Sequence, residues 1–329
     1  MRRNALVLTA FAVSIVAALT SCSAGGAPPE AGKSAASEPI TIAVMSGITT
    51  EIVMQNAIDR GTFKNAGLDA KLLGMENPPA ALAAMQGGSA NFSYAPLPTA
   101  LTALSKGIDI KIVAPADGFP DDGKGSDVDD DTALFVNPKD NITSPAQLNG
   151  QNVAVPSRSG LMEIAISGAV KQAGGDPSTI KWLALDQQSQ LTSLTQGRIH
   201  AAGLSTPFSD RAAAQGMKLL VRPVAAFFEH GVAGVWITTG SFAKEHPDVV
   251  AKFQKGTSEA NTYADAHIKD IADQVVKQQK LDIPASEVVV GYFPAAVRSA
   301  DVKRANEKMA VLGFLSKPLD LTGVVIEAK

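Results

Sequence analysis

The sequence predicts an α/β protein of two lobes, each a mostly parallel sheet flanked by helices, with a ligand cleft between the lobes. Short apolar strands alternate with helical stretches through residues 40–116 and again through residues 132–222. This alternation is typical of parallel sheets whose faces are covered by helices. An aspartate-rich segment at 117–131 separates the two runs, and each run contains one copy of a repeated order of motifs.

The repeat joins residues 82–115 and residues 191–223. Each segment predicts a helix ending in Gln-Gly, a strand that leaves through a serine close to a proline, an alanine-rich helix, and a strand that closes on proline. Any two βαβ units share this general plan, but the matching Gln-Gly and Ser…Pro marks favour an internal duplication. Duplicated halves would present strand ends and helix N-termini to one cleft, which would close on a ligand by a hinge motion.

In the first run, strands are expected at apolar segments bounded by turn residues, at 40–45, 68–74, 90–94 and 109–116. The helices between them are expected to end near Arg60, Gln86 and Lys106, each directly before a glycine that favours a helix stop. The second of these helices begins at Pro78-Pro79, where proline is tolerated in the first turn.

In the second run, the same reasoning places helices that begin at Leu161, Gln187 and Pro207. The strands around these helices are expected at 132–137, 152–155, 180–185, 199–204 and 217–222, followed by one more strand at 232–239. From Pro247 onward the pattern is helical, and Gly and Pro breaks then separate further helices at 268–279, 285–292 and 299–312.

The turn after the strand at 152–155 gives the most direct indication of a ligand. Pro156 ends the strand, and Ser157, Arg158 and Ser159 precede the helix that opens at Leu161. In α/β proteins the free N–H groups of such a turn hold anions and small ligands at the carboxyl edge of the sheet. Arg158 adds a fixed positive charge, which favours an anionic or strongly polar solute. The alternative is an ordinary turn with solvated side chains.

The segment at 117–131 reads DGFPDDGKGSDVDDD and has no apolar period. It is expected to be an exposed, solvated crossing between the lobes. A calcium loop is the alternative, but the segment lacks the terminal glutamate and the spacing of an EF-hand.

The composition argues against several functional classes. The chain has 329 residues, a net charge of -3 and 5% aromatic residues, with no basic patch interleaved with aromatics, so nucleic acid is not an expected partner. The single cysteine, Cys22, excludes disulfides within the chain and zinc sites built on cysteine. The histidines form no i, i+4 pair, and Gly-x-Gly-x-x-Gly and Walker sequences are absent. Neither a metal nor a cofactor is therefore expected.

The first residues predict an export signal. Arg2 and Arg3 precede an apolar run from Ala5 to Leu19, which is short for a bilayer span and fits the core of a signal peptide. The run closes on Leu-Thr-Ser before Cys22, which resembles a bacterial lipobox. We expect a signal peptide at 1–21, a lipid on Cys22 and a flexible tether at 22–38. An ordinary signal with a stray cysteine is the alternative.

Three motifs resemble the solute-binding lipoproteins of bacterial ABC importers, in particular the nitrate/taurine/alkanesulfonate/thiamine-precursor group. They are PAALAAMQGGSANFSYAPLPTALTALSKG, NVAVPSRSGLMEIAISGAVKQAG and LTSLTQGRIHAAGLSTPFSDRAAAQG. The resemblance implies the type II periplasmic-binding-protein fold, with lobe one at 40–116 plus 230–329 and lobe two at 117–229. It also implies a small-molecule ligand, ABC permease subunits as partners, a monomer, and a lipoprotein held at the outer face of the cell membrane.

By motif position, the resemblance places the ligand on loops that follow several strands. The implied ligand-binding residues are Ser46, Gly47, Thr49, Ser93, Tyr94, Ser157, Arg158, Ser159, Thr206, Phe208 and Trp236. Hydroxyl and backbone N–H groups would donate to carboxylate or sulfonate oxygens, and an aromatic ring would cover the organic part. The chain departs from the group at Ser205-Thr206-Pro207, where many members carry Trp-Asp-Pro, and this difference leaves the solute open.

The implied function is capture of a small, polar, anionic organic solute of sulfonate, nitrate or carboxylate type, without catalysis. One alternative is an enzyme similar to the synthase of the thiamine pyrimidine, which the resemblance ties to a cysteine-rich segment and a reactive histidine. Here Cys22 is the only cysteine, and Gly-x-Ser-x-Gly is absent around Ser159. A second alternative is an envelope sensor, which would use the same cleft.

Overall fold

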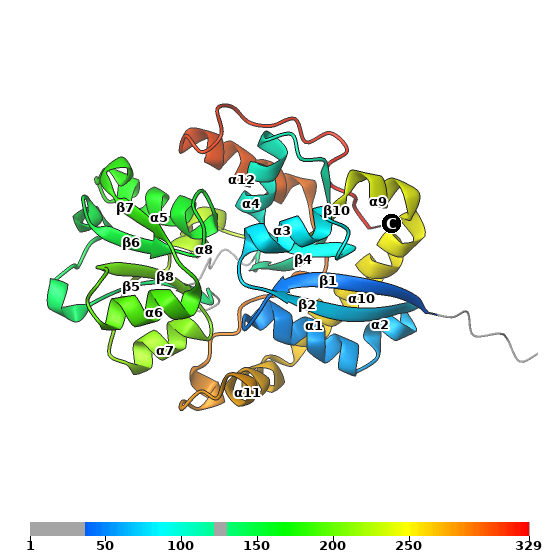
Figure 1. The fold of residues 1–329 in the computed structure, drawn as a ribbon, viewed down its shortest axis with the longest axis horizontal. Coiled ribbons are helices and arrows are strands. Elements are labelled where there is room, and N and C mark those ends of the chain that lie inside the picture. Colours follow the sequence, from blue (N-terminus) through cyan, green and yellow to red (C-terminus); the bar gives the residue numbers. More distant parts are fainter. Residues whose placement is uncertain (1–36, 122–129, 329) are drawn as a thin grey trace, which may run out of the picture. The chain divides into compact units, whose positions relative to one another are not determined.

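The computed structural model describes residues 37–121 and 130–328. The expected signal peptide at 1–21, Cys22 and nearly all of the expected tether at 22–38 lie outside the described residues. Residues 37–121 and 130–328 contain two five-stranded sheets with helices around them (Figure 1). The α/β class predicted from the sequence is therefore confirmed.

The first sheet has the strand order β2-β1-β3-β10-β4. Its strands are β1 (Glu38–Met45), β2 (Leu68–Met75), β3 (Phe92–Pro96), β4 (Ile110–Phe119) and β10 (Gly231–Thr239). β1 pairs in parallel with β2 and β3, whereas β10 is antiparallel to β3 and β4. A strand that comes late in the sequence therefore lies inside a sheet whose other strands come early.

The second sheet has the strand order β7-β6-β8-β5-β9. Its strands are β5 (Thr132–Val136), β6 (Asn152–Val155), β7 (Lys181–Ala184), β8 (Ala201–Ser205) and β9 (Lys218–Val221). β5 is antiparallel to β8 and β9, so it holds the place that β10 holds in the first sheet. The two repeated segments supply β3 and β4 to one sheet and β8 and β9 to the equivalent places in the other, as an internal duplication predicts.

The helices follow most of the predicted boundaries. They are α1 (Thr49–Asp59), α2 (Thr62–Asn65), α3 (Pro78–Gln86), α4 (Leu97–Ser105), α5 (Leu161–Gln172), α6 (Gln187–Thr195), α7 (Phe208–Ala214), α8 (Pro223–Phe228), α9 (Gly240–Glu245), α10 (Pro247–Ala266), α11 (Ile268–Gln279) and α12 (Ser299–Val311). Local chemistry explains individual ends: the Asn77 side chain accepts from the Ala80 N–H at 2.9 Å and caps α3. The short helices α8 and α9 were not predicted.

The helix predicted at 285–292 is wrong. Only Ala285–Glu287 form a 3₁₀ turn, and the chain after it is irregular, apart from one isolated bridge at Tyr292. The Gly118 N–H donates to the Tyr292 carbonyl at 2.9 Å, in an isolated antiparallel bridge beside β4. This tertiary pairing overrides the local helical pattern and brings residues 290–293 to the end of the first sheet.

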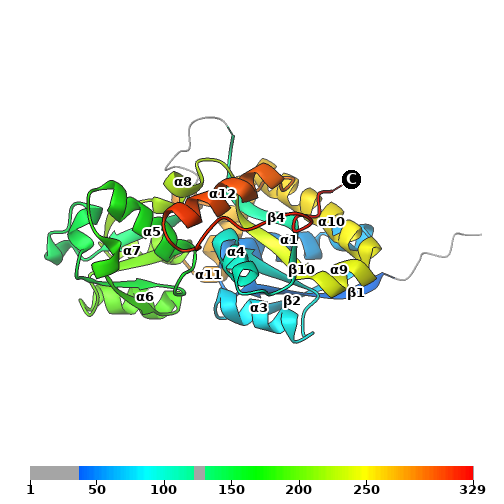
Figure 2. The same cartoon turned by 90° about the horizontal axis from the view of Figure 1, so that it is seen from above.

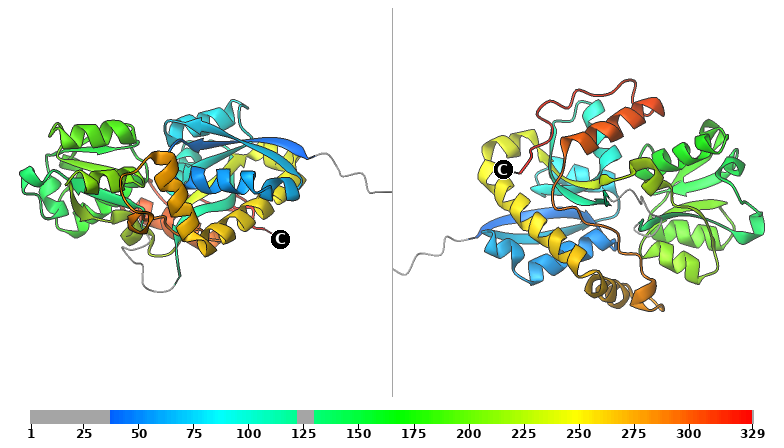
Figure 3. Two further views of the ribbon diagram at one scale, coloured as in Figure 1. Left: turned by 90° about the horizontal axis from the view of Figure 1, so that it is seen from below. Right: turned by 180° about the vertical axis from the view of Figure 1, so that it is seen from behind.

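An aromatic cluster fixes α10 to the first sheet. Phe92 of β3 and Phe253 of α10 stack with their ring centroids 3.8 Å apart, and Trp236 of β10 meets Phe253 edge-on at 6.1 Å. The Gln254 side chain donates to the Val113 carbonyl of β4 at 2.9 Å. Figure 3 shows α10 running beside α1, which it contacts. The core of this half therefore joins segments from both ends of the sequence.

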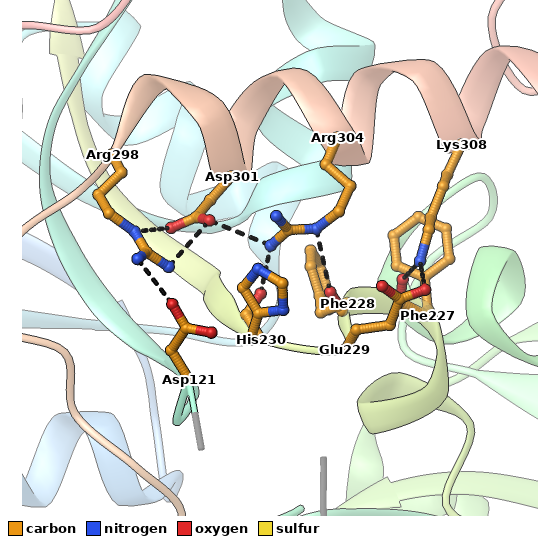
Figure 4. A network of polar contacts seen from close by, with 9 residues as sticks. All are labelled: Asp121, Phe227, Phe228, Glu229, His230, Arg298, Asp301, Arg304 and Lys308. Atoms are coloured by element: carbon orange, nitrogen blue, oxygen red, sulfur yellow. Dashed lines mark hydrogen bonds and ion pairs between the residues drawn. The ribbon is translucent and has the colours of Figure 1, made fainter. Parts of the chain in front are cut away.

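Helix α12 holds both chain segments that connect the two sheets. Asp301 on α12 is 3% exposed, and its carboxylate pairs with Arg298 at 2.9 Å and with Arg304 at 3.1 Å (Figure 4). Arg298 also pairs with Asp121, which follows β4, at 3.0 Å. Arg304 donates to the His230 carbonyl, just before β10, at 2.6 Å. The same buried carboxylate therefore orients one arginine toward each connection.

The second connection also fits closely against α12. Gly231 has a φ of +82°, and a Cβ placed there would lie 2.3 Å from the Asp301 carboxyl carbon. Both the conformation and the space therefore require glycine. Lys308 pairs with Glu229 at 2.7 Å one turn farther along the helix. Figure 2 shows α12 beside α8 and α4, both of which it contacts.

Asp301→Asn should destabilise the protein strongly. Removing one member of a fully buried ion pair costs about 3–5 kcal/mol. The loss here should lie below that range, at about 1–3 kcal/mol, because Arg298 is half exposed and keeps its pair with Asp121. Glu307→Gln on the same helix is the matched control, since its pair with Lys303 is exposed and should be worth less than about 1 kcal/mol. Urea unfolding followed by circular dichroism measures both values. Equally small losses would show that the Asp301 pairs do not hold the connections.

Candidate functional site

The carboxyl ends of parallel strands from both sheets surround one cavity of about 60 Å³. Met45, Pro96 and Ser205 are the last residues of β1, β3 and β8, and Pro156 directly follows β6. Open α/β sheets hold their ligands at this edge. The lining residues are Met45, Ile48, Thr50, Pro78, Tyr94, Pro96, Asp117, Gly118, Phe119, Asp131, Thr132, Pro156, Ser157, Leu161, Met162, Gln187, Ser205, Val224, Ala233, Val290, Gly291, Tyr292 and Phe293.

Asp117, near the end of β4, is held by donors from three other elements. Its Oδ2 accepts from the Thr50 hydroxyl at 3.2 Å, and the Tyr94 hydroxyl and the Gly234 backbone N–H also donate to the carboxylate. A Cβ at Gly234 would lie 2.4 Å from Asp117 Oδ2, so glycine is needed opposite this carboxylate. Burial outweighs the three bonds and raises the pKa of Asp117 to about 6, with a smaller contribution from the charge of Asp130.

Asp131, just before β5, brings a second carboxylate to the cavity. No donor from the described residues forms a hydrogen bond with its side chain. Burial raises the pKa of Asp131 well above its ordinary value, and repulsion from Asp117, Asp130 and Asp210 adds to the shift, while Arg222 opposes it. The Arg222 guanidinium donates to the carbonyl oxygen of Asp130. The Asp131 carboxylate is therefore an acceptor without a partner among the described residues.

The rest of the lining is aromatic, aliphatic or weakly polar. Tyr94, Phe119, Tyr292 and Phe293 contribute rings, and Ser157 and Gln187 are among the polar, uncharged groups. Among the described residues that line the cavity there is no lysine, arginine or histidine. The arrangement can hold a small solute whose body lies against the rings and whose polar group meets the carboxylates.

Two of the predicted ligand residues, Tyr94 and Ser157, are on the cavity wall. Several others are buried behind it: Thr49, Ser93, Thr206 and Trp236. The Ser93 hydroxyl donates to the Tyr94 carbonyl at 3.0 Å, and Trp236 meets the Tyr94 ring edge-on at 5.8 Å. These residues support the wall and do not form it.

Arg158 lies outside the cavity lining. Its Nε is 2.8 Å from Glu163 Oε2 and its Nη2 is 3.1 Å from Glu163 Oε1. The Ser159 backbone N–H donates to the same carboxylate at 2.7 Å. The sequence prediction that Arg158 meets the solute with its positive charge therefore finds no support in this geometry, because the guanidinium already has a bidentate partner.

In the turn before α1, a backbone N–H group also donates to a glutamate of the following helix. The Gly47 backbone N–H donates to Glu51 Oε2 at 2.6 Å, so a carboxylate of the helix occupies its own N-terminal turn. Ser46 and Gly47 do not line the cavity, whereas Ile48 and Thr50 beside them do. Phe208, also predicted, lies outside the lining, with the Arg211 guanidinium 5.3 Å from its ring centroid.

The sequence does not predict either cavity carboxylate, because the aspartate-rich pattern at 117–131 indicates an exposed crossing. That prediction is wrong at both described ends of the segment. Asp117 and Phe119 belong to β4, and Asp130 is fully buried, accepting from the Ala225 N–H and the Thr132 N–H at 2.9 Å each. One feature of the sequence could have identified Asp117 as a site residue. It directly follows the strand predicted at 109–116, and the carboxyl ends of such strands form the sheet edge where ligands bind.

Within residues 37–121 and 130–328, no group of three or more His, Cys, Asp or Glu side chains is placed to hold a metal ion. No helix in this part of the chain has the length and apolar character needed to cross a membrane. The expectation that the protein needs no cofactor remains a prediction.

Residues 50–270 match the family described as NMT1/THI5 like. The chain belongs to this family. A Bacillus subtilis protein, whose name assigns it to the binding of aliphatic sulfonates, is 22% identical over 327 residues, which cover 97% of this chain and 92% of that protein. This agrees with the group suggested by the sequence motifs.

Solved structures show the fold of this family member. The alkanesulfonate-binding protein SsuA from Xanthomonas axonopodis pv. citri, bound to MOPS, has a TM-score of 0.71 at 16% identity and covers 88% of this chain and 98% of its own. The nitrate-binding protein NrtA from Synechocystis PCC 6803 has a TM-score of 0.64 at 11% identity, covering 76% and 69%. A Candida albicans protein described as having the generic periplasmic binding protein fold has a TM-score of 0.69 at 12% identity, covering 88% and 97%. The predicted periplasmic-binding-protein fold is confirmed.

Asp117 should make the free energy of unfolding depend on pH. A carboxyl group whose pKa is higher in the folded state binds more protons there, so stability falls as pH rises from its ordinary value of 3.8 through about 6. At 1.36 kcal/mol per pKa unit, the shift corresponds to a loss of up to about 3 kcal/mol. Asp117→Asn should flatten this fall, and the exposed Asp140→Asn should not. Urea unfolding at several pH values tests the prediction, and identical profiles for all three proteins would contradict it.

Proposed function

We propose that this protein is the extracytoplasmic solute-binding component of an ABC importer, which captures a small polar solute between two lobes. The observation that carries the proposal is the cavity that strand ends of both sheets line within the described part of the chain. The names of the relatives, which refer to sulfonate and nitrate binding, support the functional class. The small volume of the cavity supports a small solute.

Hinge closure is part of the proposal. The lobes would be 40–116 plus 230–329 and 117–229, and the two connections between the sheets both contact α12. A solute that touches Tyr94 on one side and Ser157 and Gln187 on the other would favour the closed arrangement, because it binds both walls only when they are close.

The sequence before the described residues supplies the proposed location. A signal peptide at 1–21, a lipid on Cys22 and a tether at 22–38 would hold a monomeric binding protein at the outer face of the membrane. There it would deliver its solute to ABC permease subunits. The relatives described as periplasmic support an extracytoplasmic site of action.

We propose binding without turnover. Neither cysteine nor histidine is among the described residues that line the cavity, so the serines there have no adjacent imidazole base. The cysteine-rich segment expected of an enzyme similar to the thiamine-pyrimidine synthase is also absent, because Cys22 is the only cysteine.

A thermal-shift screen of the purified protein against nitrate, sulfonates, carboxylates, amines and pyrimidines tests this function. One solute should stabilise the protein clearly, by about 2.7 kcal/mol at a hundredfold excess over its Kd. Mass spectrometry should then recover that solute unchanged after incubation. A product in its place would favour an enzyme, and the absence of any stabilising solute would contradict the proposal.

Gln187→Ala should weaken binding of the solute found in that screen. Gln187 lines the cavity, and its Oε1 accepts from the Ser205 N–H at 3.3 Å, so its loss disturbs two parts of the wall. A lost hydrogen bond of about 0.5–1.5 kcal/mol corresponds to a Kd roughly two- to tenfold weaker. Gln188→Ala is the matched control, because Gln188 is the exposed neighbour on the same helix. Equal Kd values for both variants and wild type would place the solute elsewhere.

A further inference from the structure

We propose that the solute is a small organic cation with N–H donors, of the protonated-amine class, and not an anion such as those named for the relatives. The inference rests on the proposed function, since it takes the cavity as the solute site. Three features of the described residues carry it: the carboxylates on the wall, the carboxylates that accept from two helix N-terminal turns, and the aromatic rings.

The first feature is the sign of the charge on the wall. Asp117 and Asp131 line the cavity, and no basic residue of the described chain does. Asp117 has three donors, but the Asp131 carboxylate has none from the described residues, so it is the acceptor left for a solute. Asp131 is partly buried, and an N–H-bearing cation would supply both the opposite charge and a hydrogen bond to its carboxylate. An anion would add a further negative charge.

The second feature is that two of the helix N-terminal turns beside the cavity, those before α1 and α5, already hold a carboxylate. Gly47, before α1, donates its backbone N–H to Glu51, and Ser159, before α5, donates its backbone N–H to Glu163. Free N–H groups at such turns are the usual means of binding an anion in this kind of fold. Here the protein's own side chains use one such N–H group in each of these two turns, and Glu163 also pairs with the guanidinium of Arg158.

The third feature is the set of rings around the cavity. Tyr94 and Phe119 come from the first sheet, and Tyr292 and Phe293 come from the segment bridged to β4. Aromatic faces attract cations through their quadrupole, especially where water is excluded. This feature is independent of the carboxylates and favours the same charge.

Paired probes of opposite charge test the inference on the full-length protein. Thermal shift and calorimetry would compare methyl-, ethyl- and butylammonium, ethanolamine and putrescine with methane-, ethane- and butanesulfonate and nitrate. At least one amine should stabilise the protein, and the sulfonate of equal chain length should not. Tetramethylammonium, which has no N–H group, should bind more weakly than methylammonium.

The Asp131→Asn variant tests whether the amine binds to the carboxylate on the cavity wall. It should weaken the best amine about tenfold to a hundredfold, because a hydrogen bond between charged groups is lost. The variant should fold, since it removes an unpartnered carboxylate and keeps the shape. Asp140→Asn, which removes an equal charge at an exposed site, should leave the Kd unchanged.

The outcomes separate this inference from the proposed function. Stabilisation by sulfonates or nitrate and not by amines would overturn the cation and leave a solute-binding protein. An amine whose Kd is the same for wild type and Asp131→Asn would also overturn the inference, because binding would not involve the carboxylate. No stabilisation by any probe, together with no hit in the broader screen, would count against both.

Discussion

The carboxylate of Asp117 is the constraint on which the site depends. Its donors come from α1, β3 and β10, elements that are far apart in the sequence. In the sequence, β10 comes after all the strands of the second sheet. Its Gly234 lies opposite Asp117 and leaves room for the carboxylate. A buried carboxylate that lost these donors would be destabilised further. The cavity wall therefore forms only when the strand order of the first sheet is complete.

The same requirement connects the fold to the proposed function. Because β4 leads into one connection and β10 follows the other, both segments between the sheets lie beside Asp117 at one end and are held by α12 through Asp301. Motion between lobes would then change the cavity directly. A common fold hosts different solutes through the side chains on its loops. In this chain those side chains are carboxylates and aromatic rings. The solute that we propose for it therefore differs in charge from the solutes named for its relatives.

Much of the fold could be predicted because its strands and helices have clear apolar periods and Gly or Pro stops, as at Pro78 and Gly87. Predictions from the sequence are wrong where contacts between residues far apart in the sequence determine the local structure. Residues 285–292 look helical locally, but the segment is mostly irregular and pairs with the first sheet through a bridge between Tyr292 and Gly118. Asp117 looks solvated in its aspartate-rich context, but donors from distant elements bury it. The prediction for Arg158 did not include its local pair with Glu163, which lies five residues along the chain.

Calorimetric titration of the tightest-binding solute at pH 7, with wild type and with Asp131→Asn, tests the central claim most directly. Asp131 lines the cavity and accepts no hydrogen bond from the described residues, so its carboxylate should accept from an N–H group of the solute. We expect that solute to be an amine, with a Kd about tenfold to a hundredfold weaker for Asp131→Asn than for wild type. An anion as the tightest-binding solute, or an amine with equal Kd values for the two proteins, would contradict the proposal.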